Sequence, residues 1–482
     1  MSTSVRLVSL WVCVMLGTAA ASARPDFTIE TLVLKGENVP GVGLVTSIDN
    51  LAINNLGVWI VEADTDHANT DADSVLIRDG VLYLREGDAL DEPEGASIDS
   101  FDSVNVNILG DSGWNFFLDG TGGMDDDSGI YLNTDLIIQE SDISEAPEFS
   151  PGTIYIGFFE VKINDADAML VVASVDDPNI PTTVDRALVV ISSDAQSESV
   201  FAKEGDVLPG QTETVADFGT SWSRFDFTNA GDIMFFADLT GDSAADGVFY
   251  LNNTLLAQEG SPAPIEGRNW QLLSSRPLDV NNHGDYVFRG NLDGDTADDE
   301  VIIKNGVKFV QEGDTLPAIA PYTLENFGTS APVLITDNGD IVWFGDWNDP
   351  DTGIDTGLFL NDTLLVQEGV TVIDGQVVGP IARLEDCLRA SDNGRYIVFE
   401  ATLADGTNGA FLIELGCAGD VDGDGDTDHS DLGVLLACWG CCEGDPCWDQ
   451  GSPPCSAADL DHNGCVGHGD LGTLLADWGC TP

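Results

Sequence analysis

The chain has 482 residues, of which 84 are acidic and 17 are basic, and its formal net charge is −67. A charge of this sign and size repels nucleic acid and anionic lipid, which excludes proteins that work by binding either surface. Apolar residues make up 43% of the chain, enough for a substantial core, and the length fits one large and one small domain.

The first 23 residues are predicted to be a secretory signal peptide. Arg6 precedes an apolar stretch from Leu7 to Ala21, and small residues lead to a cleavage site before Arg24. The stretch is shorter than the roughly 20 apolar residues of a membrane span, and nothing later in the chain approaches that length. We therefore expect no membrane span and a secreted protein, located outside the cell or at its surface.

A turn followed by an aromatic strand recurs along residues 26–415. Examples are VNNHGDYVF from Val280 and ITDNGDIVWF from Ile335. The copies are marked by a glycine or its replacement, 53 to 64 residues apart, at Gly57, Gly110, Asp167, Gly231, Gly284, Gly339 and Gly394. Repetition at a fixed spacing is typical of a protein built from one repeated supersecondary unit.

A second phrase, a hairpin that ends in a Glu-Gly turn, follows the first six copies. Its glutamates are Glu86, Glu140, Glu204, Glu259, Glu312 and Glu368. The seventh copy lacks it, but LVLKGENVPG (Leu32 to Gly41) aligns with VFAKEGDVLPG near the middle of the chain. An N-terminal strand that completes the last repeat would close a ring of repeats.

Each repeat contains about four short apolar runs separated by Asn, Asp and Gly turns, the signal of an all-β unit. A unit of this length suits one four-stranded blade. We therefore predict a mainly β protein with a seven-bladed β-propeller over residues 26–415, closed by an N-terminal strand. Tandem β-sandwiches are the alternative.

The repeats resemble the bacterial exported NxxGxxxF tandem-repeat proteins, whose C-terminal anchoring modules vary. The chain departs from that motif at Asp167, where glycine is lost, and at Thr228, Thr336 and Ser391, where asparagine is replaced. The resemblance implies no particular reaction.

Acidic loops are expected between the second and third strands of the blades, for example DLTGDSAADG and NLDGDTADDE. They are either further calcium sites or solvated loops, and without full EF-hand spacing we favour solvated loops. The repeated glutamates are expected on the outer rim, bonded to nearby turns. Trp222, Trp270 and Trp347 are candidates for a sugar-binding surface.

Two C-terminal segments, DVDGDGDTDHSD from Asp420 and DLDHNGCVGHGD from Asp459, have the spacing of calcium-binding loops. Carboxylates at this density would repel one another unless a cation lay among them. The first loop is predicted to bind calcium through Asp420, Asp422, Asp424, the Asp426 carbonyl, Asp428 and Asp431. The second is predicted to use Asp459, Asp461, Asn463, the Cys465 carbonyl and Asp470, and to bind more weakly because Gly467 supplies no side chain.

Each loop leads into an apolar stripe with helical spacing, 39 residues apart: Leu432, Leu435, Leu436 and Trp439, then Leu471, Leu474, Leu475 and Trp478. The duplicated loop and helix resemble a type I dockerin over residues 417–482, which implies paired EF-hand loop-helix elements and a cohesin-like or other cell-surface protein as partner. The positions that dockerins use for recognition are His429, Ser430, His468 and Gly469, which depart from the usual hydroxyl pair.

Eight cysteines between Cys417 and Cys480 predict a disulfide framework of up to four bridges, with 105 pairings open. Structural zinc is the alternative. Without Cys13 of the signal peptide, one cysteine is left over, either Cys387 or one in the module.

These patterns favour an exported calcium-binding protein with no catalytic residues, in which a propeller that binds a glycan or a basic protein is anchored through the dockerin-like module. The alternative is an extracellular polysaccharide-active enzyme, a glycoside hydrolase or lyase, tethered in the same way.

Overall fold

The computed structural model describes residues 27–180, 185–194, 197–417, 419–422, 426–448, 453–460 and 463–480. Residues 26–416 form one compact unit and residues 417–482 belong to a second. The predicted signal peptide, residues 1–23, lies outside the described residues. Among the described residues, no helix is long and apolar enough to cross a membrane.

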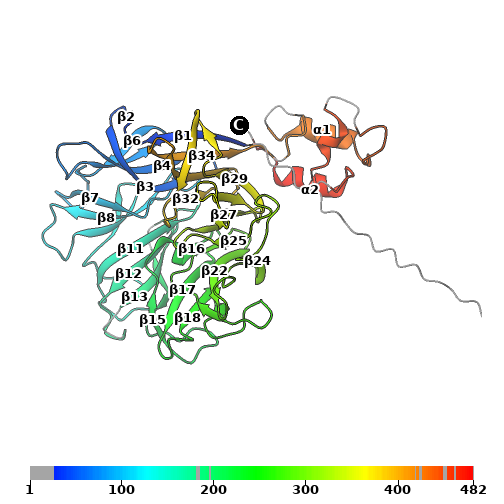
Figure 1. The fold of residues 1–482 in the computed structure, drawn as a ribbon. Helices are drawn as coiled ribbons and strands as arrows, with labels where there is room; N and C mark the ends of the chain where they lie inside the picture. Colours follow the sequence, from blue (N-terminus) through cyan, green and yellow to red (C-terminus); the bar gives the residue numbers. More distant parts are fainter. Residues whose placement is uncertain are drawn as a thin grey trace, which may run out of the picture. The chain divides into compact units, whose positions relative to one another are not determined.

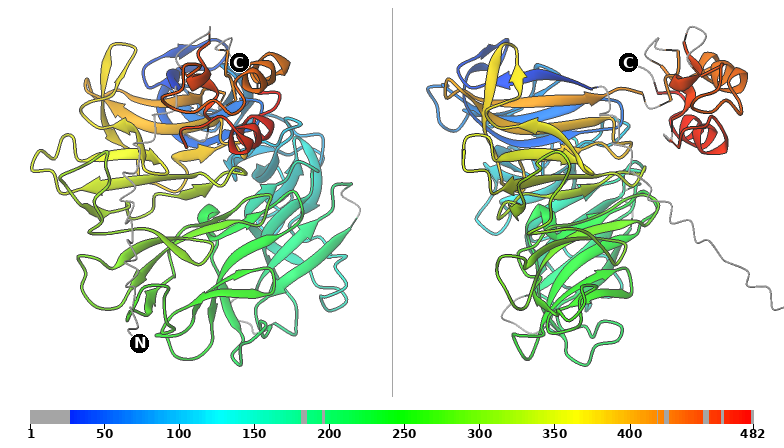
Figure 2. Two further views of the ribbon diagram at one scale, coloured as in Figure 1. Left: turned by 90° about the vertical axis from the view of Figure 1, so that its right-hand side faces the viewer. Right: turned by 45° about the vertical axis from the view of Figure 1, so that its right-hand side comes forward.

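The larger unit is a seven-bladed β-propeller, as the repeats predict. Seven antiparallel sheets are formed within the described residues. In Figures 1 and 2 their colours pass in sequence order around the unit, so each blade follows the preceding one.

The first three blades have the following strands. The first holds β2 (Asn38–Val39), β3 (Gly43–Ile53), β4 (Trp59–Thr65), β5 (Ser74–Arg78) and β6 (Val81–Arg85). The second holds β7 (Ser97–Asp102), β8 (Gly113–Asp119), β9 (Ser128–Leu132) and β10 (Asp135–Gln139). The third holds β11 (Tyr155–Ile163), β12 (Met169–Val175), β13 (Arg186–Ile191) and β14 (Glu198–Lys203).

The next three blades have a split inner strand. The fourth holds β15 (Val215–Phe218), the 3-10 turn η1 (Trp222–Arg224), β16 (Phe225–Phe227), β17 (Ile233–Leu239), β18 (Gly247–Leu251) and β19 (Thr254–Gln258). The fifth holds β20 (Trp270–Leu272), β21 (Leu278–Val280), β22 (Tyr286–Leu292), β23 (Glu300–Lys304) and β24 (Val307–Gln311). The sixth holds β25 (Leu324–Asn326), β26 (Val333–Ile335), β27 (Ile341–Trp347), β28 (Thr356–Leu360) and β29 (Thr363–Gln367).

The seventh blade joins the two ends of the propeller. It holds β30 (Val372–Ile373), β31 (Gln376–Ile381), β32 (Leu388–Ala390), β33 (Tyr396–Leu403), β34 (Asn408–Leu415) and, at its outer edge, β1 (Phe27–Leu34). β1 pairs with β34 from Phe27 opposite Leu415 to Leu34 opposite Gly409 (Figure 1). The predicted closure of the ring by the N-terminal strand is confirmed.

The core lies between consecutive blades. Each apolar cluster of the propeller combines side chains from two neighbouring sheets, and the cluster around Val33 and Val61 joins the last sheet to the first through Val398 and Leu412. Trp114 and Trp343 are fully buried in such clusters. Burial of apolar surface therefore holds the ring together all the way around.

The repeated asparagine ties each blade to the next, which explains the first recurring phrase. Asn107 Oδ1 accepts hydrogen bonds from the Leu109 and Asp111 amides and so closes its own turn. Its Nδ2 donates to the Asn164 carbonyl of the following blade (3.1 Å). Asn54, Asn164 and Asn281 donate to the next blade in the same way.

The departures from the motif keep the turn and lose the donor. Thr228 and Thr336 accept the amide four residues on through Oγ1, but a hydroxyl does not reproduce the amide's second branch toward the next blade. Asp167 adopts the left-handed conformation (φ 60°) that elsewhere uses glycine, and its carboxylate accepts a bond from Asn107 Nδ2 at 2.7 Å.

We expect Asn107→Ala to lower the free energy of unfolding by about 2–3 kcal/mol, because it leaves buried amide and carbonyl groups of two blades without partners. Urea denaturation measures the change. Asn69, an exposed loop asparagine, provides the control Asn69→Ala, which should change stability by less than about 0.5 kcal/mol. An equal effect of the two substitutions would contradict the assigned role.

The repeated glutamates stabilise the hairpin at the outer edge of their blades, as predicted. Glu312 accepts the Asp299 and Glu300 amides, and Glu86 accepts the Ser74 amide. The preceding Gln311 donates to the Asp298 carbonyl at 2.6 Å. Glutamine and glutamate together therefore fasten the acidic loop to the start of the third strand.

The smaller unit contains two short helices around a compact apolar core. They are α1 (His429–Ala437) and α2 (His468–Ala476), with a 3-10 turn η2 (Cys455–Ala458) between them. Leu435 and Leu474, at equivalent positions of the two helices, are fully buried together with Val421 and Val466.

Candidate functional site

The first loop of the smaller unit gathers carboxylates around one buried aspartate. Carboxylate oxygens of Asp420, Asp422 and Asp431 lie within 4.8 Å of one another, and so do those of Asp426, Asp428 and Asp431. Asp431 belongs to both groups and is fully buried. These hard oxygen donors are the ligands that calcium takes, so the residues present fit the ion that the spacing predicts. Asp424 lies outside the described residues.

Asp431 is held in place by backbone amides. Its Oδ1 accepts hydrogen bonds from the Val421 amide (2.7 Å) and the Asp422 amide (3.0 Å), and its Oδ2 accepts one from the Asp428 amide (2.7 Å). A carboxylate on the first turn of α1 therefore draws the two ends of the loop together.

The second loop has the same frame with fewer carboxylates. Asp459 Oδ2 accepts the Gly464 amide at 3.0 Å, Asn463 Oδ1 accepts the Cys465 amide at 3.0 Å, and the fully buried Asp470 accepts the Gly467 amide at 2.6 Å. Asp461 lies outside the described residues. Gly467 brings no oxygen from a side chain, so this loop offers the weaker donor set.

The four positions considered for partner recognition, His429, Ser430, His468 and Gly469, are exposed at the starts of the two helices. The histidine rings contact tryptophans reciprocally. His429 lies edge-on to Trp478 with ring centroids 4.9 Å apart, and His468 lies edge-on to Trp439 at 5.0 Å. Each contact therefore joins the start of one helix to the residue following the other.

The predicted apolar stripes divide between core and surface. Leu435 and Leu474 are buried, whereas Leu436 and Leu475 are 54% and 53% exposed and both tryptophans are 39% exposed. The exposed half of each stripe forms a small apolar patch beside a histidine.

Four disulfides are formed among the described cysteines: Cys417–Cys480, Cys438–Cys455, Cys441–Cys447 and Cys442–Cys465. The predicted framework is confirmed, and the remaining cysteine is Cys387, which is buried in the propeller.

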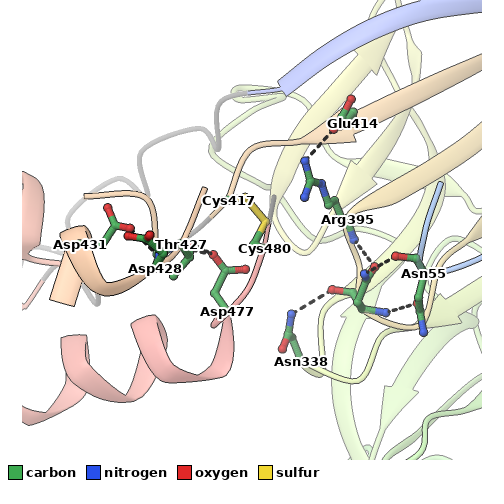
Figure 3. Close-up of a disulfide and its surroundings, with 12 residues drawn as sticks. Asn55, Asn338, Arg395, Glu414, Cys417, Thr427, Asp428, Asp431, Asp477 and Cys480 are labelled. Atoms are coloured by element: carbon green, nitrogen blue, oxygen red, sulfur yellow. Dashed lines mark hydrogen bonds and ion pairs between the residues drawn. A yellow bond between two sulfur atoms is a disulfide. The ribbon is translucent and has the colours of Figure 1, made fainter. Parts of the chain in front are cut away.

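The disulfide between the ends of the smaller unit lies beside the first loop (Figure 3). Asp477 accepts hydrogen bonds from the Gly419 amide (2.6 Å) and from Thr427 Oγ1 (2.7 Å). The end of the chain therefore clamps the loop on both sides.

The propeller has a polar cavity of about 160 Å³ along its axis. The residue two positions before the asparagine or its replacement lines it in every blade. These residues are Ala52, Asn105, Lys162, Asp226, Asp279, Leu334 and Arg389. The Trp222 indole lies between blades here, with Lys162 Nζ 4.4 Å and Arg389 Cζ 4.5 Å from its ring centroid.

Two neighbouring carboxyl groups in the cavity have opposite pKa shifts. Burial, and then the negative charge of Asp226, raise the pKa of Asp279 well above its ordinary value. Burial opposes ionisation of Asp226 too, but the charge of Lys162 (Nζ to Oδ1 3.0 Å) and hydrogen bonds from Asp279 and the Val280 amide lower its pKa. Asp226 is therefore ionised and Asp279 protonated at neutral pH.

Asparagine and aspartate side chains alternate at one end of the cavity. Asp165 Oδ1 accepts the Ile108 amide, and Asp337 accepts the Asn282 amide. Burial raises the pKa of Asp392 to about 7, and the charges of Asp337, Asp165 and Asp226 add to the effect. This opening is therefore negative, unlike the Lys162 and Arg389 layer beneath it.

The sugar-binding interpretation of three tryptophans was wrong for two of them. Trp270 and Trp347 are 3% and 2% exposed and pack in interblade clusters, because their short first strands turn these rings inward. Trp222 does line the cavity, but two cations already lie close to its ring.

Sequence reasoning missed Lys162 and Arg389. An alignment of the seven repeats could have found them, because the position two before the motif asparagine is occupied by three or four charged residues within short strands. Such residues on the innermost strand of a propeller point to an axial cavity.

A model described as "Family of unknown function (DUF7453)" matches residues 19–253, just under half of the chain. No curated protein matches. Similar solved structures include an α-L-arabinanase of Penicillium chrysogenum with arabinobiose, 12% identical, TM-score 0.28, covering 81% of this chain and 99% of that one.

Two others are an α-L-arabinofuranosidase of Fusarium graminearum with arabinobiose and a protein of unknown function from Dyadobacter fermentans. They are 9% and 8% identical, both with TM-score 0.29, and they cover 80% of this chain and 98% and 99% of theirs. Similarities with TM-scores this low carry no conclusion about activity.

Proposed function

We propose that the protein is an exported binding or assembly protein, in which the propeller is anchored through a calcium-stabilised, dockerin-like module. The observation that carries the proposal is the first loop, where carboxylates of Asp420, Asp422, Asp426 and Asp428 surround the buried Asp431. Four disulfides are in keeping with a location outside the cell.

Calcium would stabilise the module by neutralising this cluster. Asp420, Asp422, Asp424, Asp428 and Asp431, with the Asp426 carbonyl, would hold the first ion, and Asp459, Asp461, Asn463, Asp470 and the Cys465 carbonyl the second. The ion supplies positive charge and fixed geometry, while α1 and α2 pack through Leu435 and Leu474.

The partner would be a cohesin-like or other cell-surface protein. Its contact surface would be one of the two patches formed by Leu436, Trp439 and His468 or by Leu475, Trp478 and His429. Exposed tryptophans beside polar residues are the composition that protein interfaces favour.

Calcium should protect the module in the full chain. Calorimetry should detect two sites of unequal affinity, and hydrogen exchange of peptides from 417–480 should slow, because calcium at about 100 times its dissociation constant stabilises by about 2.7 kcal/mol. Asp431→Asn should abolish the tighter site. Asp445→Asn, in an exposed residue outside both loops, is the control. Identical exchange with calcium and with a chelator would refute the proposal.

A second candidate function is a polysaccharide-active enzyme, a glycoside hydrolase or lyase. It is favoured by the ionised Asp226 beside the protonated Asp279 in the axial cavity, since paired carboxyl groups with divergent pKa values can serve as base and acid. Against it, Asp226 accepts the Val280 amide and Asp279 the Ile335 amide of neighbouring blades, which gives both a structural role. Release of reducing ends from glycans by the full chain would support the enzyme, and retention without turnover would support the binding protein.

A further inference from the structure

We propose that the axial cavity of the propeller binds a carboxylate group, carried either by a small organic acid or by an acidic sugar residue, through Arg389 and Lys162. The inference concerns the propeller alone and does not depend on calcium binding by the smaller unit.

Arg389 is a buried cation without a carboxylate partner. Its side chain is 7% exposed, and Nη1 donates to the carbonyls of Glu385 and Leu388, while Nε is buried without a hydrogen-bond partner. In the part of the chain that the structure describes, no ion pair joins Arg389 to an acidic side chain. Burying a charge without a counter-charge is costly. A protein with 84 acidic residues could readily have provided one.

Lys162 places a second cation at the same ring. It is 7% exposed, it approaches the Trp222 centroid to 4.4 Å, and its single carboxylate partner, Asp226, leaves further donor hydrogens of the ammonium group available. The indole between Lys162 and Arg389 keeps the two cations apart but facing one space.

The remaining polar groups of this layer are already satisfied. Asn105 donates to three carbonyls and accepts the Gly113 amide, Asp226 accepts from Lys162 and the Val280 amide, and Asp279 accepts the Ile335 amide. The cavity therefore offers donors and positive charge, which is the complement of a carboxylate.

Size restricts the ligand. A cavity of about 160 Å³ is smaller than the roughly 300–1,000 Å³ of pockets for drug-sized molecules. It suits a small acid or a single terminal sugar, not the middle of a polymer chain. Both faces of Trp222 need not be free, because recognition would use the cations and not stacking on the indole.

The test is calorimetry on the full chain with sodium glucuronate, sodium acetate and glucose, in a buffer without carboxylates. Glucuronate or acetate should bind with one-to-one stoichiometry, and glucose should give no heat. Tighter binding of glucuronate than of acetate would assign an acidic sugar, and equal binding a free acid. Equal binding of glucuronate and glucose, or no binding of either acid, would overturn the proposal.

Arg389→Gln should weaken binding of the acid at least ten-fold. The control is Lys308→Gln, which removes the same charge from a partly exposed ion pair at the rim and should leave affinity unchanged. Trp222→Phe should abolish any fluorescence change on binding. If Arg389→Gln does not fold, the preference of the unmodified protein for glucuronate over glucose still decides the question.

Salt provides an independent measurement. The net charge of −67 repels an approaching anion at long range, whereas Arg389 and Lys162 attract it only inside the cavity. Moderate sodium chloride screens the long-range repulsion most strongly. Association should therefore become faster as salt rises, and a slower association would indicate an exposed basic patch instead and refute the axial site.

Discussion

A propeller that begins at Lys35, and so lacks β1, should lose its cooperative unfolding transition or become less stable by about 5 kcal/mol or more. β1 contributes seven paired residues to β34, and its side chains belong to two apolar clusters. Val33 is 1% exposed and packs between the last and first blades. Removing the strand therefore opens the ring at the contact that joins its two ends, where apolar burial and strand pairing are lost together.

The exposed edge of β34 would also become a template for pairing with other chains, so self-association is expected as well. Urea denaturation and gel filtration at several protein concentrations measure the two effects. The control is the chain that begins at Arg24, which retains β1. A synthetic peptide of residues 27–34 should restore stability to the shortened chain by occupying the edge. Full stability without the strand would mean that the other six interblade contacts suffice to hold the ring.

The ring closure was predictable because it depends on pattern alone. The missing seventh hairpin and the extra N-terminal one match in sequence, and a strand pair satisfies both. The same holds for the outer-rim glutamates, whose partners lie within the same blade, 12 or 13 residues earlier for Glu86, Glu312 and Glu368. Local chemistry repeated six times leaves little freedom in its interpretation.

The axial cavity could not be foreseen in the same way. Arg389 and Trp222 meet across the ring from blades separated by more than 160 residues, and nothing near either residue announces the contact. Trp270 illustrates the opposite error. It follows a turn-rich segment that suggests exposure, yet the strand β20 places the ring against Phe288 in the core. Neighbours in sequence decide turns, whereas neighbours in space decide burial.

The smaller unit lies between these extremes. Spacing alone places Asp431 and Asp470 at equivalent positions, and both are fully buried carboxylates on the first turn of a helix. The pairing of eight cysteines was not predictable, since it depends on which loops meet. Cys442 and Cys465 do so through a β-bridge between the insert and the second loop.

The propeller should be most stable in mildly acidic solution and lose several kcal/mol between pH 5 and pH 8.5. Burial raises the pKa of Glu62 to about 8, Glu204 to about 8 and Glu400 to about 7, from ordinary values near 4.5. The folded state keeps these protons at pH values where the unfolded chain has released them. Stability from the protonated forms is complete below about pH 4.5 and is lost as the pH rises through 7 to 8.

Glu204 allows this trend to be tested at one residue. It is 3% exposed, and burial is the largest cause of its raised pKa, with a further contribution from the charge of Asp217. Glu204→Gln removes the titrating group but keeps its size. The variant should unfold at a higher temperature than the parent at pH 8.5 and at nearly the same temperature at pH 5. Glu94→Gln, which changes the same charge in an exposed loop, should show no such divergence. Because deprotonated aspartates are required for calcium, a calcium-loaded module should show the reverse trend and weaken toward pH 4. Scanning calorimetry with calcium at several pH values would then move the two transitions in opposite directions, and a parallel movement of both would contradict the assignment of buried protonated carboxyls to the propeller.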